Sequence, residues 1–200
     1  MNKIYKTKIM QIEKFMQSNM SKERLQHSYN VANYAKKLAK VYGKRKKMVK
    51  LAYLAGLAHD ITKEFSDSKH LEILKKTGEQ LTKVEKQKIN LLHGLTGAYV
   101  LEKQFGIKLK DVLDAVKYHT FGSKKLKTLG KLVYIADKIE PDRCHNDAKE
   151  ARAKVGKLSL NELTLFVLNF NIEHIEEKGG IISPHSLKMK KMLERKISKK

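Results

Sequence analysis

Histidine and aspartate residues occur at positions where the helical pattern of this chain calls for apolar side chains. The apolar stripe that contains Val31 and Leu38 leads back, four residues before Val31, to His27. A second apolar segment, LAYLAGLA, runs directly into the pair His59–Asp60. An ionised carboxylate is costly to bury unless it is paired or bound to a metal. These polar residues are therefore candidates for chemistry.

Three later segments repeat the pattern. Asp137 follows the apolar residues of KLVYIA, His93 opens HGLTGAYVL, and His119 ends DVLDAVKYH. One explanation covers the whole group, because imidazoles and carboxylates that converge inside a helical bundle make a metal site. Such a nitrogen and oxygen donor set suits iron, manganese, cobalt, nickel or zinc, and does not select among them.

Each of these residues also has an ordinary structural interpretation. A lone buried histidine is most often a hydrogen-bonded core residue, and an adjacent His-Asp pair is common by chance. Asp60 could cap the end of a loop, and Asp137 could pair with Lys138 or Arg143. Only the order of the whole set along the chain favours a metal site over these alternatives.

Helices must position these residues, because apolar residues recur at helical spacing almost throughout and no strand alternation is convincing. The pattern predicts an all-α fold with helices at 3–18, 21–42, 45–59, 67–76, 81–104, 109–119, 125–140, 145–155, 159–177 and 184–197. Ser21 and Ser159 are expected N-caps, the second at capping-box spacing to Glu162. We expect an N-terminal helix over 1–20, a single helical bundle domain over 21–178, and a C-terminal segment with a lysine-rich tail over 179–200.

The charge of the chain is strongly positive, with 43 Lys and Arg against 21 Asp and Glu among 200 residues, a formal net charge of +22. Such a surface attracts polyanions, but the excess is almost all lysine, whereas base-edge and bidentate phosphate readers favour arginine. Nucleic-acid binding as the main role is therefore disfavoured. A single cysteine, Cys144, excludes a disulfide framework and points to a reducing compartment. With no signal peptide and no apolar membrane span, we expect a soluble cytoplasmic protein without membrane partners.

The order H…HD…D resembles the HD superfamily of metal-dependent phosphohydrolases, on the segments RLQHSYNVANYAKKLA, LAGLAHDITKE and YIADKIEPDR. The segments HGLTGAYVLEKQFGI, DVLDAVKYHTFG and KLVYIADKIEPDR are similar, more narrowly, to the YqeK family of symmetrical dinucleoside-tetraphosphate hydrolases. The combination of YHTxG with ADxIEPxR is far more specific than the His-Asp pair. The resemblance runs from about residue 20 to residue 170 and implies a helical HD-domain bundle.

The resemblance also implies roles for individual residues. It implies metal ligands at His27, His59, Asp60 and Asp137. It places the substrate against Arg24, His27, His93, His119, Thr120 and Arg143. The catalytic residues that it implies are Asp60, Lys63, His93 and His119. The nucleotide-contacting segment near the C-terminus of the family corresponds to Gly180–His185, where GGIISPHS is loosely similar.

The activity implied by the resemblance is cleavage of diadenosine tetraphosphate at its central phosphoanhydride by a metal-activated water, giving two ADP. Iron is the implied native metal, with manganese, cobalt, nickel or magnesium as alternatives. His93 and His119 either donate a proton to the departing ADP or hold a second metal ion, and the sequence does not decide between these roles. The resemblance also allows a homodimer.

Two other functions compete with this one. The first is another HD-type nucleotide phosphohydrolase, such as a nucleotidase or a guanosine-alarmone hydrolase, against which the YHTxG and IEPxR segments count. The second is a basic helical RNA-binding module, disfavoured because no aromatic residues interleave the basic runs Lys44–Lys47 and Lys124–Lys127. The other histidines are expected to be ordinary surface or helix-end residues, namely His70, His145, His174 and His185.

Overall fold

The computed structural model describes residues 3–43 and 45–199, so Lys44 of the first basic run and Lys200 of the tail lie outside the described residues, as do Met1 and Asn2. Within these ranges the chain is helical and has no strand, which confirms the all-α prediction. Its elements are α1 (Lys3–Asn19), α2 (Lys22–Tyr42), α3 (Lys46–Ala58), α4 (Asp67–Thr77), α5 (Lys83–Gln87), the 3-10 helix η1 (Ile89–Leu92), α6 (His93–Lys103), α7 (Lys110–Tyr118), α8 (Thr128–Ile139), α9 (Asn146–Ala153), α10 (Leu160–Glu177) and α11 (Pro184–Ile197).

One predicted helix is wrong. The segment 81–104 is not continuous but consists of α5, η1 and α6. A capping box between Thr82 and Glu85 closes the start of α5, and the backbone leaves the helical region at Lys88, with φ −131° and ψ 78°. The break lets His93 begin a new helix, while the apolar periodicity on its two sides is almost unchanged. Periodicity alone could not reveal it.

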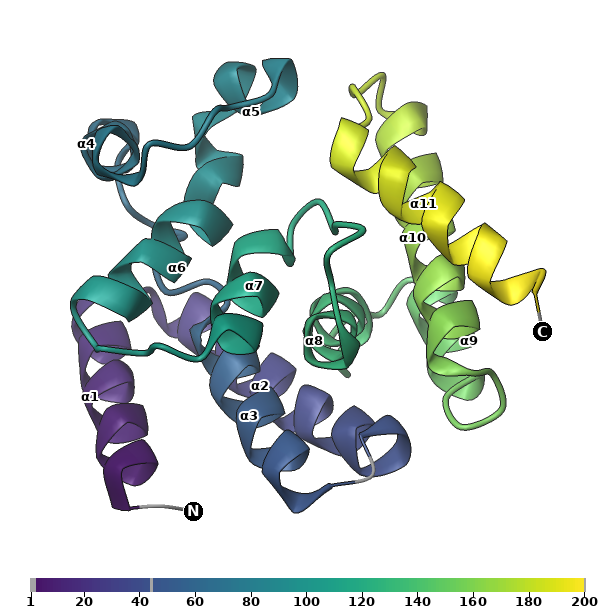
Figure 1. Ribbon diagram of the computed structural model, residues 1–200, viewed down its shortest axis with the longest axis horizontal. Coiled ribbons are helices and arrows are strands. Elements are labelled where there is room, and N and C mark those ends of the chain that lie inside the picture. Colours follow the sequence, from purple (N-terminus) through teal and green to yellow (C-terminus); the bar gives the residue numbers. More distant parts are fainter. Residues whose placement is uncertain (1–2, 44, 200) are drawn as a thin grey trace.

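Helix α8 lies at the centre of the bundle (Figure 1). It contacts α2, α3, α7 and α10, and nine of its residues are buried. A helix that is buried on nearly every side must be apolar on nearly every side, as the segment LVYIA is. Any carboxylate on such a helix, Asp137 included, therefore needs a partner.

The helices that flank α8 pack in close pairs, and glycine permits two of these approaches. A Cβ on Gly56 of α3 would lie 2.9 Å from the Cα of Ala32 in α2. A Cβ on Gly94 of α6 would lie 2.8 Å from the carbonyl oxygen of Lys117 in α7. Both distances are too short for a real side chain, so these glycines set how closely the pairs α2–α3 and α6–α7 approach.

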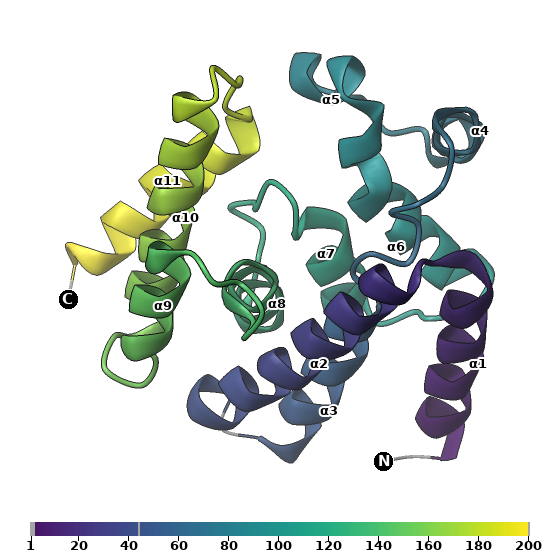
Figure 2. The same cartoon turned by 180° about the vertical axis from the view of Figure 1, so that it is seen from behind.

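The two terminal helices pack on the same hydrophobic core. Ile12 and Met16 of α1 are fully buried, as are Met189 and Leu193 of α11. In Figure 2 the α10–α11 pair stands to the left of α8, and α1 stands to its right. The boundaries of a core domain at 21–178 stay a prediction. In the part of the chain that the structure describes, no helix is both long and apolar enough to cross a membrane.

Candidate functional site

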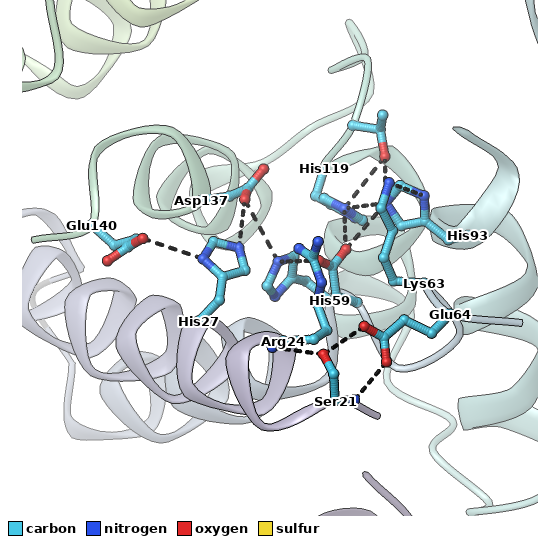
Figure 3. Close-up of polar contacts among 12 residues, drawn as sticks. Ser21, Arg24, His27, His59, Lys63, Glu64, His93, His119, Asp137 and Glu140 are labelled. Carbon is cyan, nitrogen blue, oxygen red and sulfur yellow. Dashed lines mark hydrogen bonds and ion pairs between the residues drawn. The ribbon is translucent and has the colours of Figure 1, made fainter. Parts of the chain in front are cut away.

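The residues that the sequence analysis singled out converge beside α8 (Figure 3). His27 comes from α2, His59 from the end of α3 and Asp137 from α8, and we call these three residues the Asp137 group. The Asp137 Oδ1 atom lies 3.2 Å from His27 Nε2 and 3.6 Å from His59 Nε2. One donor atom from each of the three residues lies within 4.8 Å of the others, close enough to hold one metal ion.

A second set of donors, Asp60, His93 and His119, adjoins the first, and we call it the His119 group. The Asp60 Oδ1 atom lies 3.1 Å from His93 Nε2 and 3.4 Å from His119 Nε2, and the two Nε2 atoms are 3.0 Å apart. The hydroxyl of Thr120 lies within 3.3 Å of both. The other oxygen of Asp60 is 3.5 Å from His59 Nε2, so the two groups form one cluster.

Backbone carbonyls orient three of these imidazoles. The Nδ1 atoms of His59, His93 and His119 lie 2.7, 2.8 and 2.7 Å from carbonyl oxygens three residues earlier in the chain. A carbonyl only accepts hydrogen bonds, so each Nδ1 donates, and Nε2 is the ring nitrogen that faces the cluster. This is the arrangement by which metal-binding histidines are usually fixed.

The His59 Nε2 atom is the clearest sign that a cation belongs here. His59 is fully buried, and among the described residues its Nε2 has no hydrogen-bond partner. Burial lowers the pKa of His59, but the carboxylates of Asp60 and Asp137 outweigh it and raise the pKa to about 10. A metal ion would bind the His59 Nε2 atom and would balance the negative charges of Asp60 and Asp137. The donor set therefore fits a metal ion.

The two carboxylates of the cluster stay ionised. Burial raises the pKa of Asp60, but His59, His119 and His93 lower it well below its ordinary value. Burial likewise raises the pKa of Asp137, and the neighbouring Lys138 is the largest of the influences that hold it well below that value. The Lys138 ammonium donates to Asp137 Oδ2 at 2.7 Å and to the carbonyl of His119 at 2.9 Å.

The predicted substrate-facing cations also surround the cluster. Lys63 Nζ lies 3.3 Å from His93 Nδ1, and burial lowers the pKa of this lysine. Arg143 donates through Nε to the carbonyl of Asp137 at 3.2 Å, and its Nη2 lies 3.6 Å from the carboxylate. Because 42% of the Arg143 side chain is exposed, its guanidinium has room to meet a ligand.

Arg24 contacts the cluster through Asp60, and its role as a substrate contact stays a prediction. Its Nη1 donates to Asp60 Oδ2 at 2.8 Å. The start of α2 that carries it is held by Ser21, whose backbone N–H and hydroxyl both donate to the Glu64 carboxylate, at 2.6 and 2.7 Å. Arg24 therefore orients a candidate ligand directly, whatever its contact with substrate.

Glu140 was missed by the sequence analysis. Its Oε1 lies 3.2 Å from His27 Nδ1, and the residue is 2% exposed. The backbone N–H of Asp142 donates to its other oxygen, at 2.8 Å. Glu140 follows Asp137 by three residues, which places both carboxylates on one side of the chain, so this spacing was the available signal.

Among the unassigned histidines, the expectation of a surface position is wrong for His70. This residue is fully buried, because α4 packs against α6, and its Nδ1 lies 2.9 Å from the Thr96 hydroxyl oxygen. His145 is a helix-end residue as expected, since its Nδ1 accepts from the N–H of Ala148 at the start of α9. His174 is exposed in the last turn of α10, and His185 lies in the first turn of α11.

Comparison with known proteins identifies the family. The family model described as "HD domain" matches residues 24–142, which is more than half of the chain. The chain belongs to the HD-domain family. This result confirms the family predicted from the H…HD…D order. HD domains are metal-dependent hydrolase domains, and the clustered donors of this HD domain could bind a metal ion.

Its relatives narrow the family further. The HD protein is 32% identical to "Bis(5'-nucleosyl)-tetraphosphatase, symmetrical" of Halalkalibacterium halodurans, over 84% of this chain and 88% of the relative. It is 35% identical to the protein of the same name from Staphylococcus aureus, over 67% and 69% of the two chains. The fold is also similar to a solved structure from Clostridium acetobutylicum, whose title describes a predicted HD superfamily hydrolase involved in NAD metabolism. The two structures superpose with a TM-score of 0.85 at 31% sequence identity, over 96% of this chain and 98% of that one.

Proposed function

We propose that this HD-domain hydrolase cleaves diadenosine tetraphosphate at the central phosphoanhydride and releases two ADP. The relatives named symmetrical tetraphosphatases support the substrate. The observation that carries the proposal is the convergence of the two donor groups with Lys63 and Arg143 in one cluster. Phosphoanhydride hydrolysis needs this combination, since charge on the phosphate oxygens must be neutralised while water attacks.

We propose that His27, His59, Asp60 and Asp137 hold a metal ion, with iron as the native metal. When bound, the ion supplies a water of lowered pKa and polarises a phosphoryl oxygen. A second ion at His93 and His119 is supported by their Nε2 atoms, which lie 3.0 Å apart and both face Asp60 Oδ1. A proton is a poor substitute at His119, because burial lowers its pKa to about 4.

The protein's own side chains would then position the substrate. Arg143 would bind phosphate oxygens in a bidentate manner, and Lys63 would offset charge that develops on the departing ADP. The ionised carboxylate of Asp60 accepts hydrogen bonds and would orient the attacking water. Thr120 would donate its hydroxyl to a phosphoryl oxygen, since it lies beside both histidines of the His119 group.

Product identification tests the proposal. Protein loaded with iron, manganese or cobalt should convert diadenosine tetraphosphate to ADP with little ATP or AMP, as separated by anion-exchange chromatography. Formation of ATP plus AMP, or no turnover with any of these metals, would contradict it. A panel of nucleoside monophosphates and guanosine alarmones distinguishes the alternative HD activities. The homodimer and the cytoplasmic location stay predictions, the first of which sedimentation velocity can test.

A further inference from the structure

A cavity outside the two donor groups opens on the far side of Asp137. It has a volume of about 380 Å³ and lies between the end of α8, the start of α9 and the second half of α10. Asp137, Lys138 and Arg143 form one wall, and Phe170 and Asn171 of α10 belong to the other. These three helices lie together in Figures 1 and 2. The size is that of a small-molecule pocket.

The chemistry of the walls changes along the cavity. Beside the donor groups the wall carries two cations, Lys138 and Arg143, which also face the Asp137 carboxylate. Next come two rings, Phe170 and His145, which meet edge to face with centroids 5.8 Å apart. Phe170 also contacts Phe166 edge to face at 6.2 Å, so its orientation is held from two sides. An anionic ligand with an attached aromatic ring matches this order.

The polar groups of the outer wall match a nucleoside. Asn171 brings an amide, whose NH2 group donates and whose oxygen accepts, and this pair of groups is the complement of the N7 and N6 atoms of adenine. The Asp147 carboxylate accepts hydrogen bonds of the kind that ribose hydroxyls donate. Within this one cavity the phosphate would meet Lys138 and Arg143, the ribose would meet the Asp147 carboxylate, and the base would meet the Phe170 ring.

Central cleavage of a symmetrical dinucleotide requires a nucleoside on each side of the reacting phosphates. A different cavity is lined by Tyr118, Phe121 and His185. That cavity shares no lining residue with the one beside Asp137. The Asp137 side is therefore available to the other half of the substrate.

We propose that the cavity between α9 and α10 is the binding site for the second nucleoside of the dinucleotide, with its base against Phe170 and its edge read by Asn171. This inference rests on the proposed function for the identity of the substrate. It adds residues that the donor groups do not include, and it predicts that one chain binds two ADP molecules.

Binding of ADP to the metal-loaded protein tests the site without relying on turnover. Calorimetry should give two ADP per chain for the unaltered protein and one for Phe170→Ala. The KM for diadenosine tetraphosphate should rise about tenfold in that variant, the usual effect of losing one base–aromatic stack, with metal content unchanged. Phe170→Trp should restore both values, because it keeps a stacking face.

A matched control and a second variant guard against loss of folding. Glu173→Ala removes an exposed side chain on the same helix that does not line the cavity, and it should keep two ADP per chain. Asn171→Ala should raise the KM for diadenosine tetraphosphate and leave that for diguanosine tetraphosphate unchanged. Unaltered ADP stoichiometry and KM in Phe170→Ala would overturn the site. Two ADP bound without any cleavage of the tetraphosphate would instead overturn the proposed function and leave the site standing.

Discussion

The Asp137 group and the His119 group contain the same residue types but are balanced in different ways. Around Asp137 the compensating charges come from side chains, since Lys138 and Arg143 face its carboxylate and Glu140 faces His27. In the His119 group backbone carbonyl oxygens orient both imidazoles, whereas in the Asp137 group they orient only His59, and His27 Nδ1 faces the Glu140 carboxylate. The first group therefore has more charged side chains around it, and the second has both of its imidazoles held by the backbone.

Two buried histidines show what this difference does. Burial lowers the pKa of both His59 and His119, yet the pKa of His59 ends at about 10 and that of His119 at about 4. His59 lies between the carboxylates of Asp60 and Asp137, whereas His119 has only Asp60 and faces the imidazoles of His59 and His93. Neighbouring charge, and not burial, therefore decides which histidine is cationic.

The largest expected effect comes from removing the carboxylate of the Asp137 group. Asp137→Ala should abolish stoichiometric metal and lower kcat by about a thousandfold or more, because in the proposed mechanism the bound metal would supply the hydrolytic water. Plasma emission analysis and product assays measure both losses, and circular dichroism should show nearly unchanged helicity. Asp111→Ala, which removes a carboxylate at an exposed ion pair, is the control. Stoichiometric metal in Asp137→Ala would contradict the ligand assignment.

The next effect separates the two groups. His119→Ala should reduce the metal content from about two equivalents to about one, because the Asp137 group is left intact. The kcat should fall by about a hundredfold, a smaller loss than that of Asp137→Ala. Titration of the metal-free protein with manganese, followed by electron paramagnetic resonance, gives the stoichiometry. If the unaltered protein binds only one equivalent of manganese, the His119 group holds no ion, and the expected difference between the two groups is wrong.

A smaller effect tests the charge balance of the Asp137 group. Glu140→Gln should weaken metal binding about 10- to 100-fold, because the carboxylate that orients His27 Nδ1 loses its charge. At saturating metal the kcat should return nearly to that of the unaltered protein, which a purely catalytic role would not allow. Competition with a chelator measures the affinity. An unchanged metal Kd would show that Glu140 has no part in positioning His27.

The smallest effect is a pH dependence of stability in the metal-free protein. The folded pKa of His59 is raised, so its contribution is fully present below pH 6.5 and is lost as the pH rises toward about 10. The folded pKa of His119 is depressed, so it costs stability as the pH falls from 6.5 toward about 4. The urea midpoint of unfolding should therefore no longer fall with rising alkaline pH in His59→Asn. In His119→Asn it should fall less steeply as the pH is lowered below 6.5. The same pH dependence of the urea midpoint in both variants would show that the pKa values of His59 and His119 do not shift in opposite directions.

Much of the fold was predictable because helix formation is a local matter. The apolar stripes predicted the helices to within three residues at most ends. The same stripes identified His27, His59, Asp60 and Asp137 as polar residues on apolar faces. The structure brings their side chains together, while their roles as ligands stay a prediction. The interruption between α5 and α6 was not predictable, since apolar spacing continues across it.

The sequence by itself determined the helical bundle, the family and the residue types available for chemistry, because periodicity and motif order depend on neighbours along the chain. Only the tertiary structure decided that Glu140 contacts His27 and that His70 is buried. It also decided that the pKa of His59 is raised while that of His119 is lowered. These outcomes depend on atoms from helices far apart in sequence. Their distances follow from how closely the helices pack, which Gly56 and Gly94 allow but no local pattern reveals.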